Sequence, residues 1–290
     1  MNYTTHDLHL AYQEAIQFAQ KHYENFPVVT FLIQKKLRKD AAIIYWFART
    51  ADDIADEGQF SVEQRLAQLA RLEKRLQNLL NGIFTDKFDV ALAETIKERK
   101  LSPIYFFKLL KAFRSDILFT KFQDYSEVQA YCDNSANPIG RLMLELHDIR
   151  DQKVLKLSDN ICTALQLTNF YQDFKFDIQK GRNYIPLNDL ARFGLDENNF
   201  TDPVLRRKFC EVIESQIERT KNLFLTGEEL LKYLPKKLKI EIAWTILGGR
   251  KILEKIESAK FNVIKTRPSL KKYEIISLLI KSYSYAKRFS

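Results

Sequence analysis

The spacing of apolar residues is the feature that most limits what this chain can fold into. Between residues 61 and 82, leucines recur in steps of three and four at positions 66, 69, 72, 76 and 79, and a further leucine follows at 80. Such steps place side chains on one face of an α-helix. Only 8 glycines and 7 prolines interrupt the 290 residues, too few for the many tight turns of an all-β protein. The sequence therefore predicts an all-α fold.

Start and stop signals place several of these helices. Ser61 is the expected N-cap of the leucine-rich helix, with Gln64 three residues later, and Gly82 is its stop. Ser102 is the expected cap of the next helix, with Pro103 at the first helical position. Periodicity predicts further helices at roughly residues 126–147, 159–179, 203–232, 236–258 and 269–287.

The domain organisation and compartment follow from what the chain lacks. No linker rich in Gly, Ser or Pro divides it and no short repeat recurs, so residues 1–290 are expected to form a single domain. Cys132, Cys162 and Cys210 are far apart in apolar stretches, which is typical of reduced core thiols. Neither a signal peptide nor a stretch of about 18 apolar residues is present, so we expect a cytoplasmic protein.

The net charge of +9 is compatible with several kinds of partner. It would suit a nucleic acid, an anionic membrane face or a phosphorylated substrate. Lysines and arginines are scattered along helix faces, and no recognisable nucleic-acid motif is present. We therefore expect no nucleic-acid partner.

Acidic residues crowd the end of an apolar helix at "ARTADDIADE", residues 48–57. Tyr45, Arg49, Asp52 and Asp56 step by four, three and four residues and so share one face. Asp53 and Glu57 form a second pair beside them. For a helix alone, a solvated acidic surface would be the simpler interpretation, since like charges at this spacing cost only a few tenths of a kcal/mol.

A second acidic stripe changes that balance. Gln166, Asn169, Asp173 and Asp177 step by three, four and four residues along a strongly apolar helix. We expect the two amides to lie deep in its apolar part, where an unsatisfied amide costs about 1 to 3 kcal/mol. A solvated surface does not explain such a mixed stripe, and these groups need partners.

The two acidic pairs are expected to face one another across a cavity. Carboxylate oxygens are the ligands that Mg²⁺ prefers, commonly together with water and substrate phosphates. Arg49 and Arg182 add cations suited to a diphosphate. The expected substrate is an allylic diphosphate that ionises to a carbocation above an apolar cavity, for which the 21 Phe and 13 Tyr offer material.

With "DDIAD" and "NFYQDFKFDIQKGRNYIP" in view, the chain resembles the squalene/phytoene synthase family. The second motif matches more specifically, at Asn169, Asp173, Asp177, Gly181, Arg182, Tyr184, Ile185 and Pro186. The resemblance runs from about His22 to Arg267. It implies a single-domain isoprenoid (terpenoid) synthase helical bundle around a central cavity.

The resemblance also implies roles for individual residues. Asp52, Asp56, Asp173 and Asp177 would bind two or three Mg²⁺ ions with the substrate diphosphate, and Asn169 would assist as a metal ligand. The expected substrate-binding residues are Tyr45, Arg49, Gln166, Arg182 and Tyr184. His22 occupies the position of a histidine near the diphosphate, although a lone histidine early in a helix is more often a surface or packing residue.

Departures from the family pattern narrow the resemblance. At "YCDNSANPIGRL", residues 131–142, Asn134 stands where squalene synthases carry a tyrosine. This stretch and "HYENFPV" look most like the bacterial hydroxysqualene synthases of hopanoid and squalene biosynthesis. These ionise presqualene diphosphate, made by a sister pathway enzyme, and trap the cation with water. Asn134, Ser135 and Asn137 are candidates to hold that water, and we expect Asn134 and Ser135 to be the catalytic residues among them. An equally favoured interpretation is that these side chains cap the break that Pro138 makes in the helix.

Two other functions stay open. One is head-to-head condensation of two farnesyl diphosphates, or a related squalene/phytoene-type reaction, and the other is a non-catalytic assembly factor of the same fold. No Gly-rich dinucleotide fingerprint follows a strand, so bound NADPH is not expected. A lipid substrate predicts peripheral contact with the inner face of the membrane. The amphipathic C-terminal segment could make that contact, although packing against the bundle is the more common use.

Overall fold

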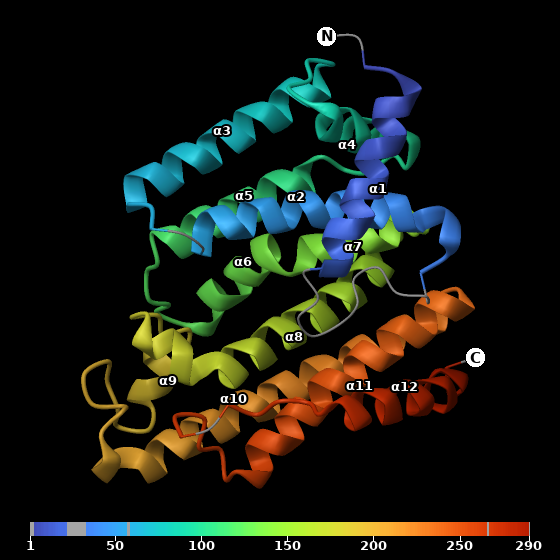
Figure 1. Ribbon diagram of the computed structural model, residues 1–290. Helices are drawn as coiled ribbons and strands as arrows, with labels where there is room; N and C mark the ends of the chain where they lie inside the picture. Colours follow the sequence, from blue (N-terminus) through green and yellow to red (C-terminus); the bar gives the residue numbers. More distant parts are fainter. Residues whose placement is uncertain (1–2, 22–32, 57–58, 266, 290) are drawn as a thin grey trace. The chain divides into compact units, whose positions relative to one another are not determined.

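Helices joined by loops make up the part of the chain that the structure describes (Figure 1). The computed structural model describes residues 3–21, 33–56, 59–265 and 267–289, and no β-strand occurs among them. The α-helices are α1 (Thr5–Lys21), α2 (Arg38–Asp56), α3 (Val62–Leu80), α4 (Lys87–Glu98), α5 (Ile104–Ile117), α6 (Tyr125–Ser135), α7 (Asn137–Leu146), α8 (Gln152–Gln179), α9 (Leu187–Ala191), α10 (Arg206–Gly227), α11 (Lys236–Ser258) and α12 (Lys272–Lys287). Short 3₁₀ helices span Lys35–Leu37, Pro203–Leu205 and Glu228–Tyr233. The all-α prediction is confirmed. None of the helices described has the length and hydropathy that a membrane-spanning segment requires.

Contacts divide the chain into two compact units. The first unit comprises Met1–Leu118 and Pro138–Asp151, and the second comprises Phe119–Asn137 and Gln152–Ser290. The expectation of a single domain stays a prediction. The first acidic stripe belongs to the first unit and the second stripe to the second unit.

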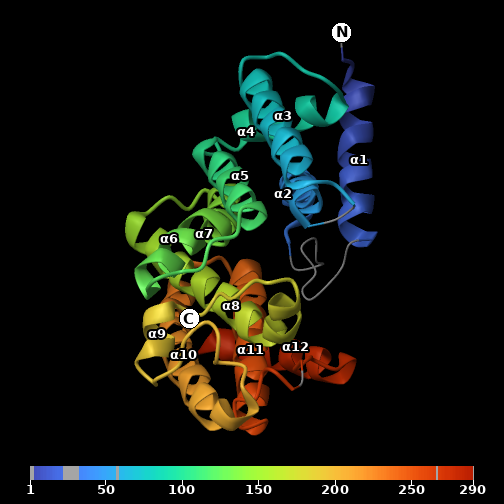
Figure 2. The same cartoon turned by 90° about the vertical axis from the view of Figure 1, so that its left-hand side faces the viewer.

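The first unit is built around α2. Helix α1 packs on α2 and α4, while α3 and α5 contact α2 and each other (Figure 2). The core contains the fully buried rings of Phe47 and Phe106, whose centroids lie 5.3 Å apart. A buried polar link adds to this packing, because Arg99 Nε donates to the fully buried Asp40 carboxylate at 2.7 Å. This pairing fixes the start of α2 and thereby positions its acidic end.

The second unit is built around α8, which contacts α6, α10 and α11, while α12 packs on α11 (Figure 1). Two glycines allow the closest approaches. A Cβ at Gly249 would lie 2.6 Å from Phe224 Cζ, and one at Gly227 would lie 2.6 Å from Ile161 Cδ1. These helices therefore meet at distances that no larger residue would permit without rearrangement.

One predicted cap is confirmed and another is wrong. Ser61 Oγ accepts from the Gln64 amide at 3.3 Å, and Gln64 Oε1 accepts from the Ser61 amide at 2.9 Å, so the capping box forms. Ser102 does not cap α5. Its hydroxyl instead donates to the buried Glu145 carboxylate at 2.5 Å. A hydrogen bond to a charged carboxylate is stronger than the bond that the hydroxyl would accept from a helix amide.

Two helix ranges differ from the predicted ones. The helix expected at 126–147 is divided at Ala136, at the break that Pro138 was expected to make, because Pro138 has no amide hydrogen and its ring crowds the carbonyl four residues earlier. The helix expected from 159 begins at Gln152. Ser158 lies buried inside α8, and the buried side chains of Val154 and Leu155 extend the packed helix before it.

Candidate functional site

The acidic end of α2 is organised by Arg49. Its Nη1 lies 3.0 Å from Asp52 Oδ2 and its Nε lies 2.6 Å from Asp53 Oδ1. One guanidinium thus partly offsets the repulsion between two neighbouring carboxylates. The Asp52 side chain is still 40% exposed, so its oxygens are accessible to a ligand. Asp53, which the sequence placed beside the main stripe, shares the same arginine.

Asp56 is the last residue of α2, where the negative end of the helix dipole disfavours a further carboxylate. Arg65 relieves part of this cost by donating to the carbonyl of Ala55. Three carboxylates, those of Asp52, Asp53 and Asp56, thus lie together at the C-terminal end of α2. The end of α2 is therefore suited to a divalent cation.

The stripe on α8 is more open than its sequence indicates. Asn169 is exposed, and Gln166, Asp173 and Asp177 are half-buried. The expectation that the amides lie deep in apolar surroundings is wrong, because the packed face of α8 is taken by residues such as Leu167. The cost of burying an amide therefore does not apply. All four side chains are accessible on one helix face.

The turn after α8 explains the Gly-Arg of the second motif. The amide of Gly181 donates to the Ile178 carbonyl at 3.0 Å, and the amide of Arg182 donates to the Asp177 carbonyl at 2.8 Å. These two bonds form a Schellman motif, which requires a left-handed residue after the helix. Gly181 supplies it with φ of +75°. The chain reverses there and places Arg182 immediately beyond Asp177.

A residue that the sequence analysis did not identify contacts this stripe. Arg267 Nε forms an ion pair with Asp173 Oδ1. The segment that carries Arg267 is fastened to α8, because the buried Gln172 donates to the Pro268 carbonyl at 2.7 Å. No local pattern could have indicated this contact, since the two partners are separated by 94 positions.

Tyr184 lies in an aromatic cluster. Its ring stacks on Phe170 with centroids 3.9 Å apart and planes 6° from parallel. Phe119, Phe122 and Tyr131 surround it at centroid distances between 5.1 and 6.2 Å. The ring thus fixes the loop after Arg182 against α8 and α6. Such packing does not test the predicted role of Tyr184 in substrate binding.

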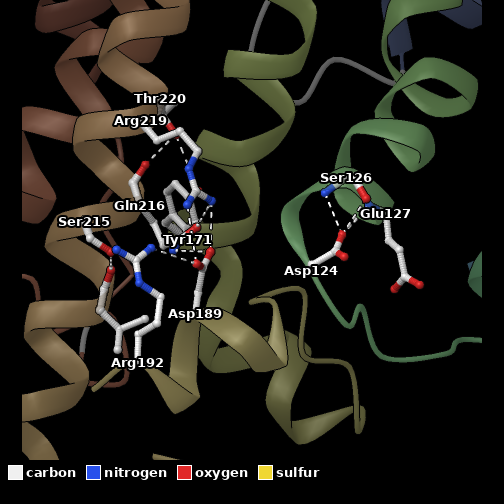
Figure 3. Close-up of polar contacts among 11 residues, drawn as sticks. Asp124, Ser126, Glu127, Tyr171, Asp189, Arg192, Ser215, Gln216, Arg219 and Thr220 are labelled. Carbon is white, nitrogen blue, oxygen red and sulfur yellow. Dashed lines mark hydrogen bonds and ion pairs between the residues drawn. The ribbon is translucent and has the colours of Figure 1, made fainter. Parts of the chain in front are cut away.

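Helix α9 anchors the end of the motif through a buried ion pair (Figure 3). Asp189 Oδ2 accepts from Arg219 Nη1 and from Gln216 Nε2, each at 2.9 Å. Burial by itself would raise the pKa of Asp189, but the bonds from Arg219 and Gln216 together with the Arg219 charge hold the pKa below its usual value. The Arg219 guanidinium also lies 4.1 Å from the centroid of the Tyr125 ring.

The end of α6 carries the proposed water-holding residues. Asn134 Nδ2 donates to the Ala130 carbonyl of its own helix at 2.7 Å, and Asn137 Nδ2 donates to Asp133 Oδ1 at 2.8 Å. Neither bond caps the break at Pro138, because the first joins a carbonyl inside α6 and the second joins two side chains. Ser135 differs, because its hydroxyl oxygen is buried and has no hydrogen-bond partner within the described chain. A buried hydroxyl of this kind commonly binds an ordered water.

The donor set fits magnesium when a phosphate contributes as well. Within the described ranges, no group of three or more His, Cys, Asp or Glu side chains is arranged to hold a metal. Each acidic stripe offers one carboxylate pair spaced four residues apart, with oxygen donors only. Mg²⁺ commonly takes one or two protein carboxylates and completes its shell with water and substrate phosphate. The residues present therefore suit an ion that binds together with a diphosphate.

Comparison with known proteins identifies the family. Residues 19–274 match the sequence model described as squalene/phytoene synthase. The chain belongs to the squalene/phytoene synthase family. This family is one of synthases that use prenyl diphosphates, the enzyme class expected from the two motifs. Both acidic stripes and the Gly-Arg turn lie inside the matched region.

Individual relatives carry different activities by name. The hydroxysqualene synthase of Zymomonas mobilis is 30% identical, with 76% of this chain and 74% of the relative covered. The 15-cis-phytoene synthase of Enterobacter agglomerans is 28% identical, with 91% and 92% covered. The chain spans 63 to 66% of the length of plant phytoene synthases that it matches.

Solved structures agree with the fold. The squalene synthase of Alicyclobacillus acidocaldarius is 30% identical and superposes with a TM-score of 0.81, covering 89% of this chain and 97% of that protein. The expected isoprenoid synthase fold is thereby confirmed. His22 lies outside the described residues, so its predicted role is not tested.

Proposed function

We propose that the protein is a Mg²⁺-dependent hydroxysqualene synthase that acts on presqualene diphosphate. The observation that carries the proposal is the open stripe of α8, closed by a turn that sets Arg182 directly beyond Asp177. Accessible carboxylates can bind metal ions, and the guanidinium that follows them along the chain can bind phosphate oxygens. This combination suits a metal-bound diphosphate better than a neutral ligand. The relatives named hydroxysqualene synthase support the choice of reaction.

The carboxylates divide the binding task with the basic residues. Asp52, Asp56, Asp173 and Asp177, with the amide of Asn169, would hold two or three Mg²⁺ ions. When bound, these ions would neutralise charge that develops on the departing diphosphate.

Several basic side chains would bind the diphosphate oxygens that the ions leave free. Arg182 is one of these side chains. Arg267 is another, because it becomes available once a Mg²⁺ ion takes its partner Asp173. Tyr45 and Gln166 would contact the substrate from α2 and α8. Arg49 is held by Asp52 and Asp53, so it enters the site already oriented.

The reaction replaces the carbon–oxygen bond to diphosphate by a carbon–oxygen bond to water, and carbon–carbon bonds of the three-membered ring rearrange between these two events. The carbon–oxygen bond of presqualene diphosphate breaks, and both electrons leave with the diphosphate. The cyclopropylcarbinyl cation rearranges, a water oxygen adds to it, and the proton of that water passes to solvent or to the released diphosphate. Among the residues of α6, we assign the water to Ser135, because its buried hydroxyl has an unused hydrogen-bonding capacity.

A substrate of this kind resides in lipid. We propose that the protein works in the cytoplasm and contacts the inner face of the membrane, receiving presqualene diphosphate there from a sister enzyme. No dinucleotide is required, because water capture consumes no hydride.

Product analysis tests the proposal. The purified protein is supplied with presqualene diphosphate, with Mg²⁺ or with EDTA, and the products are separated by chromatography. We expect hydroxysqualene and diphosphate in equal amounts with Mg²⁺ and neither with EDTA. Replacing the pair as Asn134→Leu with Ser135→Ala should divert product toward elimination, whereas Ser115→Ala on the exposed surface of α5 should not.

A second candidate rests on the phytoene synthase relatives, which match over most of the chain. Formation of presqualene diphosphate or phytoene from prenyl diphosphates, with no turnover of presqualene diphosphate, would favour head-to-head condensation. If Asp56→Ala and Asp173→Ala both left the biological activity intact, a non-catalytic assembly role would replace both enzymes.

A further inference from the structure

Helix α12 exposes a continuous apolar stripe. Tyr273, Ile276, Ile280 and Tyr283 follow one another in steps of three, four and three residues, so they share one helix face. Their exposed fractions are 66%, 59%, 68% and 45%. Exposed apolar residues scattered singly are ordinary, but four in a row on one helix indicate a binding surface.

The opposite face of α12 is the one that stabilises the second unit. Leu278, Ser282 and Ala286 are buried, and α12 packs on α11. Trp244 of α11 donates its indole hydrogen to the Ile275 carbonyl at 3.1 Å. The contact between α12 and α11 is therefore made by other residues, and the four exposed stripe residues contribute little to the core.

Positive charge borders the stripe. Lys272, Lys281 and Lys287 are exposed on α12. The only carboxylate in this helix is Glu274, and Lys255 neutralises it at 2.7 Å. The pKa of Glu274 is accordingly lowered, first by the bond from Lys255. The exposed face thus combines apolar side chains with cations and has no unpaired acid on its own helix.

A shallow pocket of about 210 Å³ adjoins the end of the stripe. Its lining includes Tyr283 and Lys287 of α12 with Lys236 and Lys239 of α11, and no described carboxylate lines it. Lys239 donates to the Phe289 carbonyl at 3.1 Å, while Lys236 and Lys287 form no ion pair with any described residue. Three ammonium groups around one hollow suit the phosphate of a lipid headgroup.

We propose that this face of α12, with the lysine pocket beside it, is the docking surface for a bilayer containing anionic phospholipid. A helix with exposed aromatic and aliphatic residues bordered by lysines lies in the membrane interface, apolar side inward and cations at the headgroups. A protein partner would need an acidic apolar groove of matching length, whereas an anionic bilayer supplies both properties on any cell membrane. This inference deepens the membrane contact proposed above and does not depend on which reaction is catalysed.

Vesicle co-sedimentation without substrate or Mg²⁺ tests the surface. The full chain is mixed with vesicles of phosphatidylcholine, or of phosphatidylcholine and phosphatidylglycerol in equal parts. We expect strong binding only to the anionic vesicles. Lys236→Gln with Lys287→Gln should weaken it roughly 25-fold, since each cation near an anionic surface contributes roughly fivefold. Ile276→Ser with Ile280→Ser should weaken it roughly 10-fold or more.

Matched variants control for composition. Val204→Ser with Leu225→Ser removes two exposed apolar side chains elsewhere, and Lys97→Gln with Lys156→Gln removes two exposed cations. Both should bind as the unchanged protein does. Circular dichroism should show that every variant is folded.

Two results would overturn the proposal. Equal binding to both vesicle types would remove the role of the cations, and unchanged binding of the Ile276 and Ile280 variant would remove the role of the stripe. If that variant instead converted a dimer to a monomer in size-exclusion chromatography, the stripe would be a contact between copies. Turnover of detergent-dispersed presqualene diphosphate, measured on the same variants, separates a failure of this surface from a failure of the proposed reaction.

Discussion

Asp189→Asn should destabilise the second unit by removing the charge that holds α9 to α10. Asp189 is only 6% exposed and is bonded to Arg219 and Gln216 (Figure 3). Asparagine preserves the size of the side chain. It replaces one acceptor oxygen by an NH₂ group that faces a guanidinium.

The expected loss follows from these contacts. A hydrogen bond to a charged group contributes about 1.5 to 3 kcal/mol, and leaving one member of a buried ion pair alone costs about 3 to 5 kcal/mol. The Arg219 side chain is 27% exposed and can regain some hydration, which favours the lower end of that range. We expect a fall of about 3 kcal/mol in the free energy of unfolding.

Urea denaturation followed by circular dichroism measures this loss. Glu254→Gln is the control, because its partner Lys251 lies at the surface and such pairs contribute less than about 1 kcal/mol. The folded-state pKa of Asp189 is lowered, so its contribution is present above the ordinary aspartate pKa of about 3.9. That contribution is lost as pH falls through the folded-state value. The difference between the two proteins should therefore shrink below about pH 4.

Equal urea midpoints for Asp189→Asn and the unchanged protein at pH 7 would refute this reasoning. So would a loss that stayed constant as the pH was lowered into the acid range, because a purely steric defect does not titrate.

Three further substitutions test individual statements about the site and its frame. Gly181→Ala should lower the free energy of unfolding by about 1 kcal/mol, because φ at this position is +75° and alanine disfavours that conformation. The new Cβ itself would meet no atom within 4 Å. An unchanged midpoint in urea denaturation would contradict the left-handed turn. Gly249→Ala should cost about 1 to 3 kcal/mol for a different reason, the 2.6 Å approach to Phe224, and the paired variant Phe224→Leu should recover part of it. Arg267→Gln should leave folding unchanged but lower kcat/KM about tenfold by removing the partner of Asp173, and unchanged kinetics would exclude Arg267 from the site.

Much of the fold could be predicted because its determinants are local. The capping box at Ser61 needs only residues three positions apart. The break at Pro138 follows from the ring and the missing amide hydrogen of proline itself. The start of α8 could not be placed in this way. Ser158 has a local preference for capping, but contacts made by distant residues bury it inside the helix.

The site divides along the same line. The spacing of Asn169, Asp173 and Asp177 on one face, and the glycine that ends α8, could be predicted from the sequence because both depend on helix geometry. The exposure of Asn169 was predicted wrongly, since burial depends on what packs against each face. The Arg267 contact with Asp173 depends on how the chain returns to α8 after 94 residues, for which the sequence carries no local signal.

The proposed function requires that each acidic pair contributes to binding the metal-bound diphosphate and to its departure. Single-turnover release of diphosphate from presqualene diphosphate at saturating Mg²⁺ tests it most directly, with Asp52→Asn, Asp173→Asn and the double variant compared. We expect each single variant to release diphosphate about a hundredfold more slowly, and the double variant to lose less than the product of the two effects. Release at the unchanged rate by either single variant would contradict the claim.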